Sequence, residues 1–178
     1  MANVVTGKVR LSFCDLKEVG KLDGKYGVTA LVDKGDKALI EKIKKAIKTA
    51  QEEGKSSKWN GKIPANCHNP LRDGDAEDAR DEYAGCYYFR AKSNRRPGIV
   101  DRERNEIFDL DEVYSGCYAR LDVNFYPYAF QGSVGVAVGL NNIQKWADGE
   151  RFSGGVKNAE NAFNDGYEDD TDDLADLL

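Results

Sequence analysis

A chain of 178 residues has room for one domain with a sizeable core, and its 40% hydrophobic content is that of an ordinary globular protein. No apolar stretch approaches the ~20 residues of a membrane helix, and residues 1–10 lack the apolar segment of a secretion signal, so we expect neither a membrane partner nor export. The formal net charge of −5 at first argues against a polyanionic partner such as nucleic acid.

That charge is unevenly divided along the chain. Residues 159–178 contain eight acids and no Lys or Arg, which leaves 23 acids against 26 basic residues and a net charge of +3 for residues 1–158. We therefore expect a mildly basic globular domain over residues 1–158 and a flexible acidic tail over residues 159–178, because a segment of this composition cannot bury enough surface to fold alone. The tail should be attracted to the basic domain, and salt should screen that attraction.

The first elements in chain order are predicted to form a β-hairpin. A period-two alternation places one set of side chains on the core face of a strand over residues 4–13: Val5, Gly7, Val9, Leu11 and Phe13. A second strand over residues 25–32 begins just after Asp23-Gly24, a dipeptide typical of turns.

One clear helix follows, over residues 36–51. Its apolar residues recur at helical spacing, Asp36 is suited to cap its N-terminus, and Gly54 follows its expected C-terminal end. Lysines occupy its other faces, and a solvated helix face is a more common role for such a run than a binding patch. The four cysteines are widely scattered, which favours reduced thiols, buried where they fall in strands.

Residues 54–83 show no clean period, and a connection of this length is usually functional or mobile. The acids between residues 73 and 82 lack the full calcium-loop pattern, so a solvated acidic loop is the favoured interpretation. Cys67-His68 stands too far from the other cysteines for a standard zinc spacing. We expect neither a metal nor another cofactor.

Three further strands are predicted over residues 85–93, 116–126 and 133–140. In the first, Tyr88, Arg90 and Lys92 share one face, and the second alternates apolar residues with an outward face of polar and aromatic ones. The third has a Gly/Ala face, which indicates close packing or close approach of a ligand. The whole predicts a mainly β protein: an OB-fold-like five-stranded barrel with one major helix and a disordered acidic C-terminal tail.

Aromatic side chains beside basic ones on a sheet face are typical of single-stranded nucleic-acid binding, because unpaired bases stack on aromatic rings while cations contact the phosphates. The candidate contacts come from the sheet face, a basic loop and the first hairpin: Lys8, Arg10, Lys25, Tyr88, Arg90, Lys92, Arg95, Arg96, Arg102, Arg104, Tyr118, Arg120, Tyr126 and Tyr128. The alternative interpretation is that these tyrosines simply cover the outside of a barrel.

Three stretches of the sequence carry a family resemblance: Val113-Tyr114-Ser115-Gly116-Cys117-Tyr118-Ala119-Arg120, the continuation through Asn124-Phe125-Tyr126 to Gly139-Leu140-Asn141-Asn142-Ile143-Gln144-Lys145, and Lys25-Tyr26-Gly27-Val28-Thr29. In these stretches the chain resembles a family of bacteriophage single-stranded-DNA-binding proteins. It implies an OB-fold, single-strand binding during phage DNA replication or recombination in the cytoplasm of the infected bacterial host, and an acidic tail that recruits phage or host replication proteins. Two features depart from it: the chain ends in Leu177-Leu178 and not in an aromatic residue, and the helix precedes the third strand.

The expected activity is therefore sequestration of single-stranded DNA without catalysis, with the acidic tail competing for the same surface. Two other classes stay open. A metal-dependent nuclease could use Asp101 and Glu103, or the acids at 73–82, because two-metal chemistry requires carboxylate pairs. A protein–protein interaction module could use the same Tyr and Arg surface, since both residues are enriched at interface hot spots. Weak duplex DNA binding and a homodimer also stay open.

Overall fold

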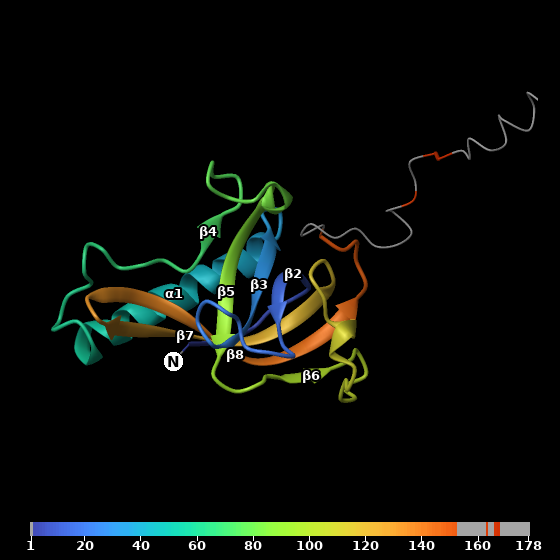
Figure 1. Ribbon diagram of the computed structural model, residues 1–178. Coiled ribbons are helices and arrows are strands. Elements are labelled where there is room, and N and C mark those ends of the chain that lie inside the picture. Colours follow the sequence, from blue (N-terminus) through green and yellow to red (C-terminus); the bar gives the residue numbers. More distant parts are fainter. Residues whose placement is uncertain (1, 153–162, 164–165, 168–178) are drawn as a thin grey trace, which may run out of the picture.

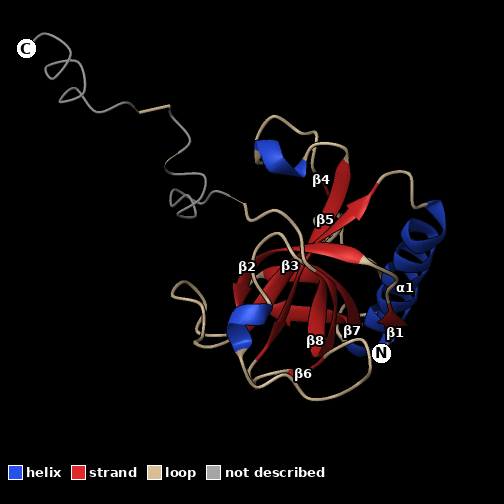
Figure 2. Ribbon diagram, turned by 90° about the vertical axis from the view of Figure 1, so that its right-hand side faces the viewer, coloured by secondary structure: helices blue, strands red, loops and turns tan. Residues whose placement is uncertain are grey.

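The computed structural model describes residues 2–152, together with 163, 166 and 167. Five strands close a ring in the order β7, β2, β3, β5, β8 and back to β7. Their bounds are β2 Val9–Asp15, β3 Tyr26–Asp33, β5 Cys86–Ser93, β7 Tyr118–Phe130 and β8 Ser133–Ala147. β5 and β8 pair in parallel and the other ring pairs are antiparallel. The predicted OB-fold barrel is confirmed, and Figure 2 shows its strands gathered beside the helix.

The expected first strand is interrupted, and the prediction of a continuous strand over residues 4–13 is wrong. It is divided into β1, Ala2–Val5, and β2. Between them the buried Thr6 hydroxyl accepts a hydrogen bond from the Leu121 backbone N–H and donates one to the Gly7 carbonyl. Before the interruption, Val4 lies in the core and Val5 is 46% exposed. The alternation predicts the opposite, with Val5 on the core face.

The helix α1, Lys37–Ser57, is longer than predicted. The Asp36 carboxylate accepts a hydrogen bond from the Leu39 N–H, so the predicted N-cap is confirmed. Gly54 lies inside the helix and not after it. The buried ring of Trp59 packs against it, and a Cβ at Gly54 would lie 2.5 Å from a Trp59 ring carbon. The apolar face of α1 covers β1 and β7 and so closes one side of the core.

β7 and β8 continue past the ring as a long hairpin, which Figure 1 shows projecting beside α1. They pair from Tyr118↔Ala147 to Phe130↔Ser133, and the register shifts between Tyr118 and Ala119 and again between Asp122 and Val123. Gln131 and Gly132 form the two-residue turn, with φ angles of 49° and 81°, as a type I′ turn requires. Both strands exceed their predicted lengths, and β7 runs past the predicted end at residue 126, so that it includes Tyr128 and Phe130.

Short strands complete the sheet: β4, Arg72–Asp73, pairs with β5, and β6, Gly98–Val100, pairs with β8. Two 3-10 helices lie in the connections, η1 Asp81–Tyr83 and η2 Leu110–Glu112. The barrel interior is apolar, with Phe89 and Phe125 in contact at 6.0 Å between ring centroids. All four cysteines are free thiols, and Cys117 is fully buried as predicted, whereas Cys86 is half-buried. In the part of the chain that the structure describes, no helix is long and apolar enough to span a membrane.

Candidate nucleic-acid interface

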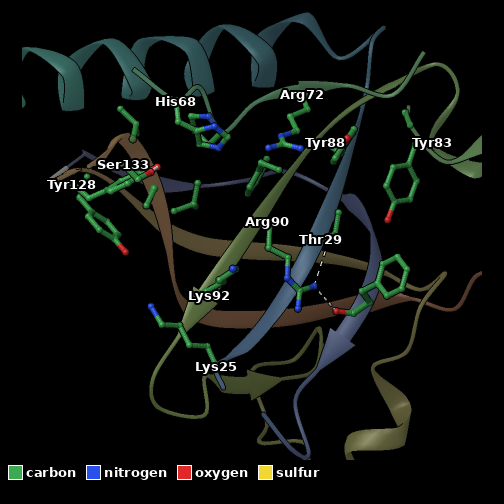
Figure 3. A pocket seen from close by; sticks show the side chains of 18 of the residues that line it. Lys25, Thr29, His68, Arg72, Tyr83, Tyr88, Arg90, Lys92, Tyr128 and Ser133 are labelled. Carbon is green, nitrogen blue, oxygen red and sulfur yellow. Dashed lines mark hydrogen bonds between the residues drawn. The ribbon is translucent and has the colours of Figure 1, made fainter. Parts of the chain in front are cut away.

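A groove of about 810 Å³ opens where β5 and β8 diverge. The two strands pair only at Lys92↔Gly139, so the ring is thinly closed there and the strands separate toward the hairpin tip. The groove is lined by β5, β7 and β8, by the β2 residue Phe13, by Thr29 of β3 and Lys25 just before that strand, and by the connection between α1 and β5. Figure 3 shows His68 and Arg72 on one side of the opening and Lys25 and Lys92 on the other, with Arg90 beside Lys92.

The groove carries an excess of positive charge. Its lining contains five basic residues, Lys25, Arg72, Arg80, Arg90 and Lys92, and the acid Asp78. Lys92 forms an ion pair with Asp23 at 2.8 Å, and this hydrogen bond, with a second from the Lys25 backbone N–H, lowers the pKa of Asp23.

By contrast, Lys25 and Arg72 have side chains without an ion-pair partner among the described residues. These two cations are free to meet phosphates without first breaking an internal salt bridge.

Arg90 is largely committed to internal contacts. Its guanidinium donates to the Phe13 carbonyl at 2.6 Å, to the Thr29 hydroxyl at 3.3 Å, and to the Asp15 carboxylate at 2.6 Å. Figure 3 shows it extending from β5 across β3 toward β2. Arg90 therefore braces the floor of the groove, and its charge is already matched by Asp15.

Aromatic rings form much of the remaining lining. Tyr83 and Tyr88 contact each other at 4.9 Å between centroids, and the Tyr83 hydroxyl is hydrogen-bonded to Ser12 at 2.9 Å. Burial raises the pKa of Tyr83, so its hydroxyl stays protonated at neutral pH. Tyr126 and Tyr128 line the groove from β7. Phe130, near the hairpin tip, is 69% exposed, which leaves its ring available to a ligand.

The 64–72 loop forms the wall opposite Lys25. His68 pairs with the edge of β8, its N–H donating to the Val134 carbonyl at 2.9 Å and its carbonyl accepting from the Val136 N–H at 3.0 Å. This close approach explains the predicted small-residue face, because a Cβ at Gly135 would lie 2.5 Å from the His68 Cβ. Burial, together with the nearby positive charge of Arg72, lowers the pKa of His68, so the imidazole is neutral at pH 7.

The predicted candidates are thus divided. The structure brings six of them together in the groove: Lys25, Tyr88, Arg90, Lys92, Tyr126 and Tyr128. Three others form a separate cluster near the opposite end of β7, where Lys8 and Arg10 lie over the Tyr118 ring at 5.1 and 5.7 Å from its centroid. Arg10 also donates to the carbonyls of Gly116 and Glu150.

The remaining candidates lie outside the groove as well. Arg120 joins segments of the barrel, donating to the Thr6 carbonyl at 3.0 Å and the Gln144 amide oxygen at 3.4 Å. Arg96 donates to the carbonyls of Leu16 and Lys17, whereas Arg95 extends from the same loop with an exposed side chain. Arg102 lies over the Trp146 ring at 4.1 Å, and Arg104 is exposed in the turn that follows β6.

Sequence reasoning missed several groove residues: Phe13, His68, Arg72, Arg80 and Tyr83. Phe13 was predicted to face the core, but a bulge between Ser12 and Asp15 turns its ring outward, where it is 48% exposed. The others come from the connection between α1 and β5, which has no periodicity to reveal its path. Its unusual length was the available signal.

Three carboxylates of the nuclease alternative have other partners. Asp73 and Asp75 bind the Lys34 ammonium at 2.7 and 2.6 Å. One carboxylate oxygen of Asp101 accepts the backbone N–H groups of Glu103 and Asn105, which closes a turn. Within residues 2–152 and the three described tail positions, no group of three His, Cys, Asp or Glu residues is placed to bind a metal ion.

Comparison with known proteins gives a consistent result. A family model described as the single-stranded-DNA-binding protein of Enterobacter phage Enc34 matches residues 2–175. Protein p50 of Acyrthosiphon pisum secondary endosymbiont phage 1 is 37% identical over 171 residues, covering 88% of this chain and 90% of the relative.

Two solved structures are similar in fold. The single-stranded-DNA-binding protein from bacteriophage Enc34, in complex with single-stranded DNA, has a TM-score of 0.73 at 23% identity and covers 85% of this chain and 90% of its own. The single-stranded-DNA-binding protein gp2.5 of bacteriophage T7 has a TM-score of 0.59 at 14% identity, covering 94% of this chain and 98% of its own. At these identities the two structures establish a shared fold.

Proposed function

Because the chain belongs to the Enc34 family of phage single-stranded-DNA-binding proteins, we propose that it binds single-stranded DNA non-catalytically along the groove between β5 and β8. The observation that carries this proposal is the composition of the groove. Exposed or half-buried aromatic rings line a surface whose basic residues include two, Lys25 and Arg72, with no ion-pair partner among the described residues.

The groove offers both interactions that a single strand requires. Stacking of an unpaired base on an aromatic ring contributes ~1–3 kcal/mol, and it needs no particular base sequence. Each phosphate contact releases condensed counterions and adds about 0.7 to the magnitude of the slope of log affinity against log salt. A duplex hides its base faces, so we expect it to bind through its phosphates alone and more weakly.

The biological setting is part of the same proposal. Such a protein would protect single strands during phage DNA replication or recombination, in the cytoplasm of the infected host. The acidic tail, residues 159–178, would compete with DNA for the groove and, once displaced, recruit phage or host replication proteins. The tail lies almost entirely outside the described residues, so its composition alone, eight acids without a basic residue, supports this role.

The test is a titration of the protein with a fluorescent oligo(dT) and a duplex of matching length, at several salt concentrations. Arg72→Gln should weaken single-strand binding and reduce the salt slope by ~0.7. Lys44→Gln is a matched control, because it removes one positive charge from the exposed face of α1. Equal behaviour of the two variants would contradict the assignment of the groove.

The role of the tail is tested separately. A protein lacking residues 160–178 should bind oligo(dT) more tightly than the full chain at low salt, because the competing polyanion is gone. The difference should shrink as salt rises, since the attraction between tail and groove is screened. Unchanged or weaker binding by the truncated protein at low salt would contradict autoinhibition while leaving DNA binding itself intact.

A further inference from the structure

Phe13 in β2 has a strained backbone conformation. Its φ angle is 48°, in the left-handed region where the Cβ of an L-residue crowds the following carbonyl oxygen. Glycine and asparagine adopt this region readily, whereas a bulky aromatic residue is a genuine outlier. Strain of this kind persists only where the surroundings over-determine it, and it clusters at functional sites.

Two side chains from other segments fix the Phe13 backbone. The Phe13 N–H donates to the Ser115 hydroxyl at 2.7 Å, and Arg90 donates to the Phe13 carbonyl at 2.6 Å. The backbone N–H and carbonyl of the bulged residue, which do not pair with a neighbouring strand, are thereby both hydrogen-bonded. The result is that the Phe13 ring is 48% exposed, whereas Leu11 and Ser12 just before it are 0% and 2% exposed.

The exposed ring lies at a junction of two depressions. It lines the groove and also an adjoining cleft of about 370 Å³ formed with the 20–23 turn. The Arg80 guanidinium lies over it, 4.8 Å from the ring centroid. A planar group therefore already occupies one face of this ring. A nucleobase is also planar, and base stacking is in general stronger than an exposed cation–π contact. Replacing the Arg80 guanidinium with a base on this face of the ring is therefore favourable.

We propose that Phe13 is a base-stacking residue of the groove, and that Arg90 is the positioning residue that fixes its ring toward the DNA. The proposal rests on the proposed function, single-strand binding along the groove, and adds a contact that the strand pattern assigned to the core. It also gives Arg90 a different role from the phosphate contact expected from the sequence, because its guanidinium is used by Phe13, Thr29 and Asp15.

The central test compares Phe13→Leu with Phe13→Tyr in oligo(dT) titrations at several salt concentrations. Phe13→Leu should weaken binding by roughly 5- to 150-fold, the range for loss of one stacked base, while the salt slope stays unchanged because stacking releases no counterions. Phe13→Tyr keeps a ring and should bind like the wild type. Phe108→Leu is the matched control, since it removes an 84% exposed phenylalanine that does not line the groove.

Two further variants separate stacking from a purely structural role. Phe13→Gly relieves the strained φ, so its melting temperature should equal or exceed that of Phe13→Leu while its DNA affinity stays low. Arg90→Lys keeps the charge but cannot make the same fork of contacts, so affinity should fall with an unchanged salt slope.

Wild-type affinity in Phe13→Leu, or affinity losses that only follow lowered melting temperatures, would overturn the stacking role. Failure of the wild type to bind oligo(dT) would overturn the proposed function instead.

Discussion

Gly135 in β8 has no room for a side chain, and Gly135→Ala is expected to detach the 64–72 loop from the hairpin. A Cβ at this position would lie 2.5 Å from the His68 Cβ, 2.7 Å from its backbone nitrogen and 2.8 Å from its backbone oxygen. Real Cβ atoms essentially never approach another heavy atom within 3.0 Å, and backbone atoms cannot rotate away as the end of a side chain can. The loop must therefore move.

The cost follows from the contacts that the loop makes with β8. Moving it breaks two backbone hydrogen bonds, between His68 and the strand residues Val134 and Val136. Each contributes a net ~0.5–1.5 kcal/mol, so the free energy of unfolding should fall by about 1–3 kcal/mol. For a domain of roughly this size, 1 kcal/mol corresponds to ~2–4 °C, which gives a drop in melting temperature of about 2–12 °C. Single-strand affinity should fall too, because His68 and Arg72 would leave the groove wall.

Thermal unfolding and oligo(dT) titration of Gly135→Ala measure both effects. Gly139→Ala, in the same strand, is the matched control, because a Cβ there would meet a Tyr126 ring carbon at 3.5 Å and the Asn124 carbonyl at 3.9 Å, which are ordinary contacts. The control should be as stable as the wild type or slightly more so, since alanine restricts the unfolded chain. If the two variants unfold at the same temperature, the close approach of His68 to β8 is refuted.

Two other predictions concern single residues. Because the pKa of His68 lies below its usual 6.5, its imidazole adds a positive charge to the groove only in acid. Single-strand affinity should therefore rise as the pH falls from 7.5 to 5.5, by less than about tenfold per pH unit for one bound proton. His68→Gln, which removes the chain's single histidine, should abolish this pH dependence. Gly54→Ala should lower the free energy of unfolding, because its Cβ would lie 2.5 Å from the Trp59 ring, even though alanine favours a helix by ~1 kcal/mol over glycine. A higher urea midpoint for this variant would contradict the prediction and show that the Trp59 ring moves aside at little cost.

The barrel could be predicted from the sequence because its signals are local. The alternation in β5 separates Phe89 and Ala91, which the structure buries in the core, from Tyr88 on the opposite face, where it lines the groove. The helix begins where its capping residue predicts, since the Asp36 carboxylate can meet the Leu39 N–H without help from the rest of the fold. Elements of this kind depend on neighbours in sequence.

The site was only partly predictable, since alternation gives the face of a strand but not the position along it. Tyr118 and Tyr126 have the same parity in β7, yet eight residues of strand separate them by ~26 Å. Tyr126 therefore lies in the groove, whereas Tyr118 lies beside Lys8 and Arg10.

The bulge that exposes Phe13 depends on hydrogen bonds from Arg90 and Ser115, which are distant in sequence. The path of the 64–72 loop depends on backbone pairing with β8, and no residue pattern encodes that pairing. Contacts of this kind appear only once the barrel has closed.

The most direct test of the central claim is photocrosslinking of the full-length protein to an oligonucleotide that carries 5-iodouracil, with the crosslinked residues identified by mass spectrometry. If the strand lies in the groove, crosslinks should map to Tyr88, Tyr126 and Tyr128 and to Phe13. Crosslinks confined to Tyr118 and its neighbours would contradict the account, because they would place the DNA on the cluster with Lys8 and Arg10 and leave the groove for another partner.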